Sequence, residues 1–130
     1  MQRLTVETSS REQFVDITGD IRRAVAELGL DEGAVLVYSP HTTAGITVNE
    51  GYDPDVAADV QDWLRDRIPH RDGYAHAEGN SDSHIKAILT GGGQLLPVAG
   101  GELALGRWQA VFFCEFDGPR HREVWVTAVG

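Results

Sequence analysis

The chain has 130 residues and a mass of 14.2 kDa, which is the size of one domain and excludes a two-domain enzyme. Hydrophobic residues make up 42% and charged residues 24%, a globular composition, and no apolar run approaches the ~20 residues that a membrane span needs. The formal charge of −9 repels phosphate backbones, which argues against a nucleic-acid partner. We therefore expect a single domain over residues 1–130 that binds neither nucleic acid nor a membrane.

The first residues and the cysteine content favour the cytoplasm. No apolar stretch follows Met1, so we expect no secretory signal. The one cysteine, Cys114, excludes an internal disulfide framework and a cysteine-cluster zinc site, and it fits a reducing compartment. We expect Cys114 to be a small buried hydrophobic residue and not a nucleophile.

The first elements are two strands and a helix. Residues 4–8 alternate between apolar and polar side chains, and after a turn residues 14–17 do the same, which predicts two strands. Apolar residues then recur at helical spacing over residues 21–28, and Gly29 is placed to end that helix. The candidate caps at its start are Thr18 and Asp20.

Two further strands and a second helix follow. The continuous apolar run 35–38 predicts a strand that is buried on both faces. Residues 42–50 alternate, with apolar side chains on one face and small polar ones on the other. Asp53 followed by Pro54 predicts the start of a helix, because proline at the first helical position loses no needed donor, and this helix continues to Ile68.

The segment 70–83 has little apolar periodicity, and irregular segments of this length are usually functional or mobile. A short third helix follows, capped by Ser81 or Asp82 and continuing through Leu89. We expect Lys86, the only lysine, to be a solvated residue of this helix.

The rest of the chain is of strand character and is interrupted by short glycine-containing turns. A mixture of helices with strands joined by short turns predicts an α+β domain, with about three helices on a mostly antiparallel sheet or sandwich. The predicted C-terminal strands are residues 95–98, 103–105, 108–116 and 123–129.

Three histidines are candidate metal ligands. His41 follows a predicted strand, His76 lies in the irregular segment, and His84 is in the first turn of the third helix. A catalytic metal site needs about three protein ligands and an open position. The spacing matches no short metal motif, so surface or structural roles remain open for all three, and we expect such roles for His70 and His121.

The start of the third helix is a candidate anion site. A glycine-containing loop that opens a helix presents free backbone N–H groups and the positive end of the helix dipole to an anion. The carboxylate of Asp82 would repel a bare phosphate there unless a cation lies between them. The alternative is that Ser81 and Asp82 only cap the helix.

The apolar strand over residues 112–116 contains one carboxylate, Glu115, which would carry a buried charge without a cationic partner. Such carboxylates have perturbed pKa values, which occur at active sites and also in structural ion pairs. Arg120 follows a Gly-Pro turn, and its planar guanidinium suits a phosphate or a carboxylate such as Glu115.

Three segments together resemble the YjbQ family, also called UPF0047. They are HTTAGITVNE at 41–50, NSDSHIKA at 80–87, and LPV at 96–98 followed by Gly101, Leu103, LGRWQ at 105–109 and Glu115. They occur in order over nearly the whole chain. The family usually has Gly-Pro-Ser or Gly-Ser-Ser before the Leu-Pro-Val strand, whereas this chain has three glycines at 91–93.

The resemblance implies a small α+β protein that assembles as a trimer and has a secondary thiamine-phosphate synthase activity. That reaction joins a hydroxymethylpyrimidine diphosphate to a thiazole phosphate, and it needs both reactants held in line and the leaving pyrophosphate neutralised. The positions that match polar motif residues of the family are His41, Asn49, Glu50, His76, Asn80, Asp82, His84 and Glu115.

On this basis we assign roles to the candidate residues. The expected cofactor is a divalent metal, zinc or magnesium; three histidines suit zinc better, because magnesium prefers oxygen ligands. The expected metal ligands are His41, His76 and His84; the phosphate- and substrate-binding residues are Thr42, Thr43, Asn49, Asn80, Ser81 and Arg120; and the catalytic residues are Asp82, Glu115 and Glu50.

Two alternatives to the synthase remain open. One is a non-catalytic trimeric protein that binds an anion or a metabolite, and the other is a metal-dependent phosphoester hydrolase. In each case the expected partners are a small phosphorylated metabolite and further copies of the chain.

Overall fold

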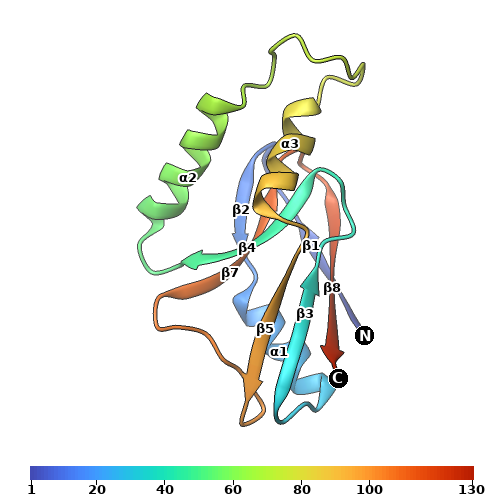
Figure 1. Ribbon diagram of the computed structural model, residues 1–130, viewed down its shortest axis with the longest axis vertical. Helices are drawn as coiled ribbons and strands as arrows, with labels where there is room; N and C mark the ends of the chain where they lie inside the picture. Colours follow the sequence, from blue (N-terminus) through green and yellow to red (C-terminus); the bar gives the residue numbers. More distant parts are fainter.

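Two antiparallel β-sheets and three helices make up the computed structural model, which describes residues 1–130 (Figure 1). The larger sheet has the strand order β1-β8-β3-β5-β6 and the smaller one has the order β2-β7-β4. The expected α+β class is confirmed. The elements are β1 Gln2–Glu7, β2 Gln13–Asp16, α1 Thr18–Leu28, β3 Gly33–Tyr38, β4 Ala44–Glu50, α2 Pro54–Arg67, α3 Ser81–Thr90, β5 Gly93–Ala99, β6 Glu102–Leu103, β7 Gln109–Glu115 and β8 His121–Val129.

The main hydrophobic core lies between the inner faces of the two sheets and α1. Val37 of β3 and Ile46 of β4 are fully buried there, as are Phe113 of β7 and Ile21 of α1. Alternate strand residues point to the same face, so the period-2 patterns of the sequence supply this core. Burying each such side chain stabilises the fold by roughly 1.5–3 kcal/mol.

Strand β3 was expected to be buried on both faces, and this prediction is wrong. Its burial alternates, since Val35 and Val37 are buried whereas Tyr38 is 43% exposed. The buried residues of α1 belong to the core between the sheets, so this helix leaves the outer face of the larger sheet open. On that open face Leu36 lies opposite Leu95 of β5, which is 63% exposed.

Helix α1 is ended as predicted but is not capped as predicted. Gly29 takes a left-handed conformation with φ of 66°, which glycine adopts without the steric cost of a Cβ. At the other end, neither Thr18 nor Asp20 caps the helix. Instead, a carboxylate oxygen of Asp16 accepts a hydrogen bond from the Thr18 amide at 2.9 Å.

Helix α2 begins as predicted at Pro54, with the Asp53 carboxylate accepting a hydrogen bond from the Asp55 amide at 2.9 Å. Leu64 is its only buried residue, and it belongs to a second, smaller core with Phe112 of β7. This second core lies on the face of the smaller sheet that is turned away from the main core. Helix α2 is therefore held to the domain by little apolar burial.

Helix α3 has its charged face inward, contrary to expectation. Lys86 was expected to be solvated, but its side chain is only 1% exposed, and the Asp82 side chain is completely buried. Asp82 does not cap the helix, and the N-cap residue Asn80 makes no side-chain cap bond either. The three large apolar residues of the helix, Ile85, Ile88 and Leu89, are exposed instead.

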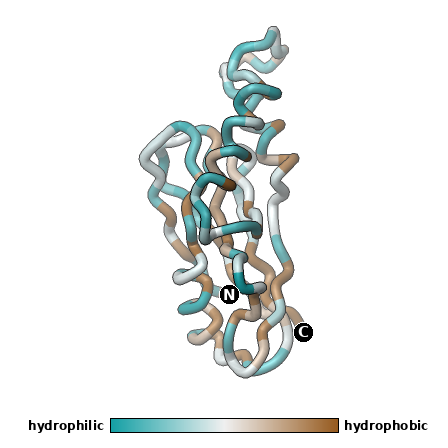
Figure 2. Tube along the Cα trace, turned by 90° about the vertical axis from the view of Figure 1, so that its left-hand side faces the viewer, coloured by the Kyte–Doolittle hydropathy of each residue, from teal (hydrophilic) through white to brown (hydrophobic).

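A segment without helix or strand, residues 68–80, joins α2 to α3 and projects from one end of the molecule (Figure 1). It is mostly hydrophilic, whereas hydrophobic residues concentrate along the strands (Figure 2). No helix has the length and apolar character required to cross a membrane.

Candidate functional site

Two of the predicted metal ligands line one cavity. His41 follows β3 and His84 is in the first turn of α3, and both line a cavity of about 340 Å³ together with Thr42. We call this cavity the histidine cavity. The remaining wall is small and apolar, formed by Ala44, Ala87, Ile88 and Gly92. Residues that are 43 positions apart in the sequence thus face the same space.

The His41 ring is fixed from two sides. Its Nε2 accepts a hydrogen bond from the Glu123 amide at 2.9 Å, and the ring lies edge-on to Phe113. Burial lowers the pKa of His41, and the Arg122 cation lowers it further, so the ring is neutral at pH 7. Because Nε2 accepts, the proton of the neutral ring resides on Nδ1. His41 can therefore donate one hydrogen bond but has no free lone pair.

His76 lies beside His84, with 5.4 Å between the ring centroids and an angle of 88° between the planes. It lines a neighbouring cavity of about 190 Å³ together with Ser81. The three histidines thus gather around the start of α3.

These residues do not form a ready metal site. No group of three or more histidine, cysteine, aspartate or glutamate side chains is placed to hold a metal ion. The Nε2 lone pair of His41 is also already used by the Glu123 amide. The expected zinc or magnesium ion lacks a ligand set in this conformation, and we derive no chemical step through it.

Asp82, expected to be catalytic, belongs to a buried ion network. Arg11 donates to both of its carboxylate oxygens at 3.0 and 3.2 Å, and Lys86 Nζ donates to Oδ2 at 2.9 Å. Lys86 also donates to Glu12 at 2.8 Å, and Arg65 of α2 joins the network through Glu12. Burial alone would raise the pKa of Asp82, but hydrogen bonds from Arg11 and Lys86 lower it. These partners make Asp82 a structural carboxylate.

Glu115, also expected to be catalytic, is fully buried and saturated with donors. Arg122 donates to both of its oxygens from Nε and Nη2, the Thr8 hydroxyl donates to Oε2 at 2.8 Å, and the Asp117 amide donates to Oε1 at 2.9 Å. Burial alone would raise the pKa of Glu115, but these donors, with Arg122 first, lower it. The cationic partner of Glu115 is thus Arg122 and not Arg120.

Thr43 belongs to the same structural network. Arg122 Nη2 donates a hydrogen bond to its hydroxyl at 2.8 Å, and Thr43 is only 6% exposed. A phosphate cannot reach this hydroxyl in this conformation. Of the two expected threonines, only Thr42 lines the histidine cavity.

Asn49 and Glu50 lie elsewhere, at the end of β4. Both line a cavity of about 120 Å³ between the smaller sheet and α2, a cavity that none of the histidines lines. The Asn49 side chain accepts a hydrogen bond from the Glu50 amide, and the Glu50 carboxylate accepts one from the Tyr52 amide. The structure therefore does not bring Glu50 together with the other expected catalytic residues.

Asn80 and Arg120 lie near each other, on either side of Asp117. Asn80 Nδ2 donates to Asp117 Oδ2 at 2.8 Å, and Arg120 Nη2 donates to the same oxygen at 3.1 Å. Asn80 Oδ1 is buried and has no hydrogen-bond partner. Both residues line a polar cavity of about 540 Å³.

Sequence reasoning missed two residues that organise this end of the molecule, Arg11 and Arg122. For Arg122 a signal exists. It shares the period-2 pattern of Val124 and Val126, whose side chains point into the core, so an arginine at that position requires a buried anion. For Arg11, which lies in a turn, the sequence holds no comparable signal.

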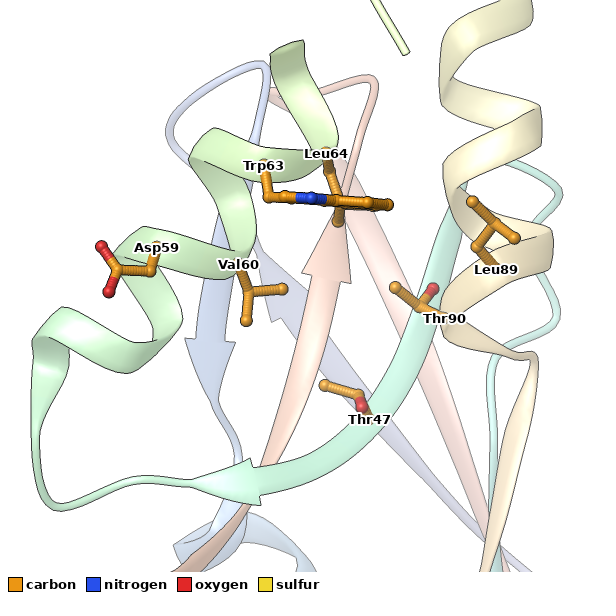
Figure 3. A pocket seen from close by; sticks show the side chains of 7 residues that line it. All are labelled: Thr47, Asp59, Val60, Trp63, Leu64, Leu89 and Thr90. Atoms are coloured by element: carbon orange, nitrogen blue, oxygen red, sulfur yellow. The ribbon is translucent and has the colours of Figure 1, made fainter. Parts of the chain in front are cut away.

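An apolar groove of about 540 Å³ separates α2 from α3, and none of the expected site residues lines it. Figure 3 shows the Trp63 ring extending from α2 toward Leu89 and Thr90 of α3, above Thr47 of β4. Trp63 is 53% exposed and Leu89 is 61% exposed.

Comparisons with known proteins cover nearly the whole chain. The family profile described as UPF0047 protein YjbQ-like matches residues 2–130. A UPF0047 protein of Methanocaldococcus jannaschii is 46% identical over 125 residues, which cover 96% of this chain and 91% of that protein. UPF0047 protein YugU of Bacillus subtilis is 40% identical over 131 residues, covering 100% of this chain and 99% of that protein.

Solved structures agree with this result. The crystal structure of a YjbQ/UPF0047-family protein of Clostridium acetobutylicum matches with a TM-score of 0.97 and 46% identity, covering 99% of this chain and 100% of that one. A protein of Sulfolobus solfataricus, described as of unknown function, matches with a TM-score of 0.94 at 29% identity, covering 99% and 95%. The chain belongs to the YjbQ/UPF0047 family.

Proposed function

We propose that this chain binds a small phosphorylated metabolite in the histidine cavity, and that it catalyses a transfer of the thiamine-phosphate synthase type. The observation that supports this proposal is the convergence of His41, Thr42 and His84 on one cavity from two distant segments. Hydroxyl and imidazole N–H groups are suitable donors to phosphate oxygens.

In this reaction the thiazole nitrogen attacks the methylene carbon of the hydroxymethylpyrimidine diphosphate. A C–N bond forms, the C–O bond breaks, and pyrophosphate leaves with the electron pair. The protein contributes chiefly by holding both reactants in line and by donating hydrogen bonds to the leaving oxygens. His41 suits that role, because its neutral ring donates from Nδ1 while the Glu123 amide holds Nε2.

One observation favours a second candidate, a non-catalytic metabolite-binding protein. The carboxylates of Asp82 and Glu115 are buried and fully occupied by cationic and amide donors. A carboxylate held in this way is ionised and has no free geometry for proton transfer to a ligand. With this arrangement the protein can still hold and orient a ligand, but Asp82 and Glu115 cannot act as its general acid or base.

The test compares product formation with binding. Purified wild-type protein is incubated with hydroxymethylpyrimidine diphosphate and thiazole phosphate, and thiamine phosphate is quantified by chromatography. The expected result is turnover above background that falls at least tenfold in His84→Ala and in His41→Ala. His121→Ala is the matched control, because the His121 side chain is 83% exposed and lies beside Glu7, outside the histidine cavity.

Each other outcome contradicts either the synthase activity or its assignment to the histidine cavity. Binding of either phosphate compound without product supports the metabolite-binding protein. Release of inorganic phosphate from a generic phosphoester, lost in His84→Ala, supports the hydrolase. Equal product formation in wild type and His84→Ala removes the histidine cavity from the reaction.

We also propose that the chain assembles as a homotrimer, as its family resemblance implies. The outward face of α3 supports this proposal, since Ile85, Ile88 and Leu89 form an exposed apolar ridge. The larger sheet offers an uncovered face with exposed Tyr38 and Leu95. A ridge on one copy that packs against a sheet face on the next is a heterologous contact, which closes into a ring of three if each copy is rotated by a third of a turn from the last.

Sedimentation velocity measures this assembly directly. The wild type is expected to sediment as a trimer, and Leu89→Asp as a smaller species, because a charge on the ridge would have to be buried without a partner. Ala58→Asp, which introduces the same charge at an exposed position of α2, is the control and is expected to remain trimeric. A monomeric wild type would contradict the proposal.

A cytoplasmic location is consistent with the state of Cys114. This thiol is free and completely buried, and burial raises its pKa, so it is neither paired nor activated.

A further inference from the structure

Three consecutive glycines, at 91–93, lie where α3 ends and β5 begins, and the backbone requires only two of them. Gly91 has a φ of 92°, which residues with a Cβ rarely adopt. At Gly93 a Cβ would lie 3.2 Å from the Val37 carbonyl oxygen, closer than side chains normally approach. Gly92 has neither constraint, since its φ is not positive and a Cβ there would meet no other residue within 4 Å. The fold therefore does not explain the glycine at position 92.

Gly92 lies in the wall of the histidine cavity, and much of that wall is similarly bare. Three of the seven lining residues, Gly92, Ala44 and Ala87, have no side chain beyond a methyl group. The two histidines and Thr42 supply the polar groups of the same cavity. The histidine cavity thus combines hydrogen-bonding side chains with a wall from which no long side chain projects.

Buried Ser39 fixes this wall relative to His41. Its amide donates a hydrogen bond to the Gly92 carbonyl at 2.8 Å, and its hydroxyl donates to the Ala44 carbonyl at 2.9 Å. The same hydroxyl accepts a hydrogen bond from the His41 amide at 3.3 Å. Ser39 is only 3% exposed, so water does not compete for these bonds. The bare wall and the backbone that carries His41 are therefore held together as one hydrogen-bonded unit.

The two kinds of surface suit the two parts of a phosphorylated metabolite. Phosphate oxygens require donors, which the histidines and Thr42 can supply. The rest of the molecule requires apolar surface of matching shape. A flat ring can approach the peptide at Gly92 closely, because no Cβ holds the ring away from the backbone. A side chain at this position would occupy the space that such a ring needs.

We propose that Gly92 is a specificity-determining residue of the histidine cavity: it leaves room for the ring of an aromatic phosphate whose phosphoryl group binds at His41, Thr42 and His84. The inference rests on the proposed function in placing a phosphorylated metabolite in this cavity. It adds the orientation of that metabolite and a preference for an aromatic over a short aliphatic body. Gly92 takes no part in the chemistry.

The test uses two phosphonates, phenylphosphonate and methylphosphonate, which differ only in the group on phosphorus and have no ester bond to hydrolyse. NMR titration gives the Kd of each. Wild type is expected to bind phenylphosphonate about tenfold more tightly, because the ring buries apolar surface. This preference should fall to about threefold in Gly92→Ala and disappear in Gly92→Val, as a methyl and then a branched side chain occupy the space of the ring. The Kd of methylphosphonate should stay unchanged in both variants.

Gly19→Ala is the matched control. Gly19 of α1 also lacks a positive φ, its Cβ would lie an ordinary 3.7 Å from Arg23, and it does not line the histidine cavity. This variant should bind both phosphonates as the wild type does. Urea unfolding separates specificity from structure, because a purely structural role of Gly92 would lower the free energy of unfolding and leave the ratio of the two Kd values unchanged. Gly92→Ala decides the question if Gly92→Val does not fold.

Three results would overturn the proposal. They are the absence of a preference for phenylphosphonate in the wild type, an unchanged preference in the folded Gly92 variants, and an equal loss of both phosphonates in those variants. The proposed function fails separately. His84→Ala is expected to weaken both phosphonates to the same extent, and equal binding by wild type and His84→Ala would remove the phosphate from His84. An absence of thiamine-phosphate formation removes the synthase and leaves the role of Gly92 intact if the preference for the ring still depends on Gly92.

Discussion

Replacing Arg122 by methionine tests whether the network around Glu115 is structural. The Arg122 side chain is 6% exposed and that of Glu115 is completely buried, and Arg122 supplies two of the four hydrogen bonds that Glu115 accepts. Arg122→Met would leave a buried carboxylate without its cation. Removing one partner of a buried pair costs about 3–5 kcal/mol, which lowers the folded-to-unfolded ratio by about two to four powers of ten.

Two further variants isolate the charge. Arg120→Met removes an exposed arginine from the same hairpin and should cost at most about 1 kcal/mol. Glu115→Gln combined with Arg122→Met leaves no buried charge, so it should recover at least half of the loss. Urea unfolding, followed by tryptophan fluorescence at one fixed chain concentration, gives the free energy of unfolding for each.

The pH dependence of the free energy of unfolding tests whether ionised Glu115 stabilises the fold. Because the folded-state pKa of Glu115 is lowered, its contribution to stability is complete above the unfolded pKa, about 4.3, and is lost as the pH falls through the folded pKa. Wild type should therefore lose more stability than Arg122→Met between pH 6 and pH 3. A loss below about 1 kcal/mol in Arg122→Met at pH 7, or a double variant no more stable than the single one, would refute the structural role.

Three other predictions follow from the packing. Gly45→Ala should lower the free energy of unfolding in urea by about 1–3 kcal/mol, because a Cβ there would collide with Thr90 and the Gly91 carbonyl. Gly92→Ala is the control and should be nearly neutral, since its Cβ would point into open space. Equal effects of the two substitutions would contradict this packing. Cys114 should not react with a thiol reagent until the protein is unfolded, because burial raises its pKa, and rapid reaction of the native protein would show otherwise. In an NMR titration the ring protons of His41 should shift with a midpoint below 6.5, the ordinary pKa of histidine, and a midpoint above that value would contradict its desolvated environment.

Periodicity was sufficient to predict the elements, because strand and helix patterns are local. The alternating run 42–50 became β4, and Asp53 caps α2 as its position before Pro54 predicts. The burial of Asp82 and Lys86 could not be predicted in this way. Arg11, the partner of Asp82, and Glu12, a partner of Lys86, each lie more than 70 residues away, and only the folded chain brings these charges together.

The sequence could suggest which residues belong to the candidate site, but it could not predict how these residues are arranged in space. His41 and His84 share a cavity because the segment after β3 lies beside α3, a nonlocal contact that no spacing rule contains. The sequence suggested Arg120 as a partner of Glu115, whereas the partner in the structure is Arg122, two positions later. The pleat of β8 directs Arg122 inward, and Arg120 lies in the turn before this strand. Glu50 lies at the other end of β4 from His41, so a motif that is contiguous in sequence is divided in space.

The order of strands in the larger sheet determines when the domain can form during translation. Strand β8 lies between β1 and β3, so β1 has no neighbour in its sheet until residues 121–129 have been made. A nascent chain still held in the ribosomal tunnel must therefore keep β1 and one edge of β3 unpaired. A chain that stops before His121 would lack the strand that joins β1 to β3.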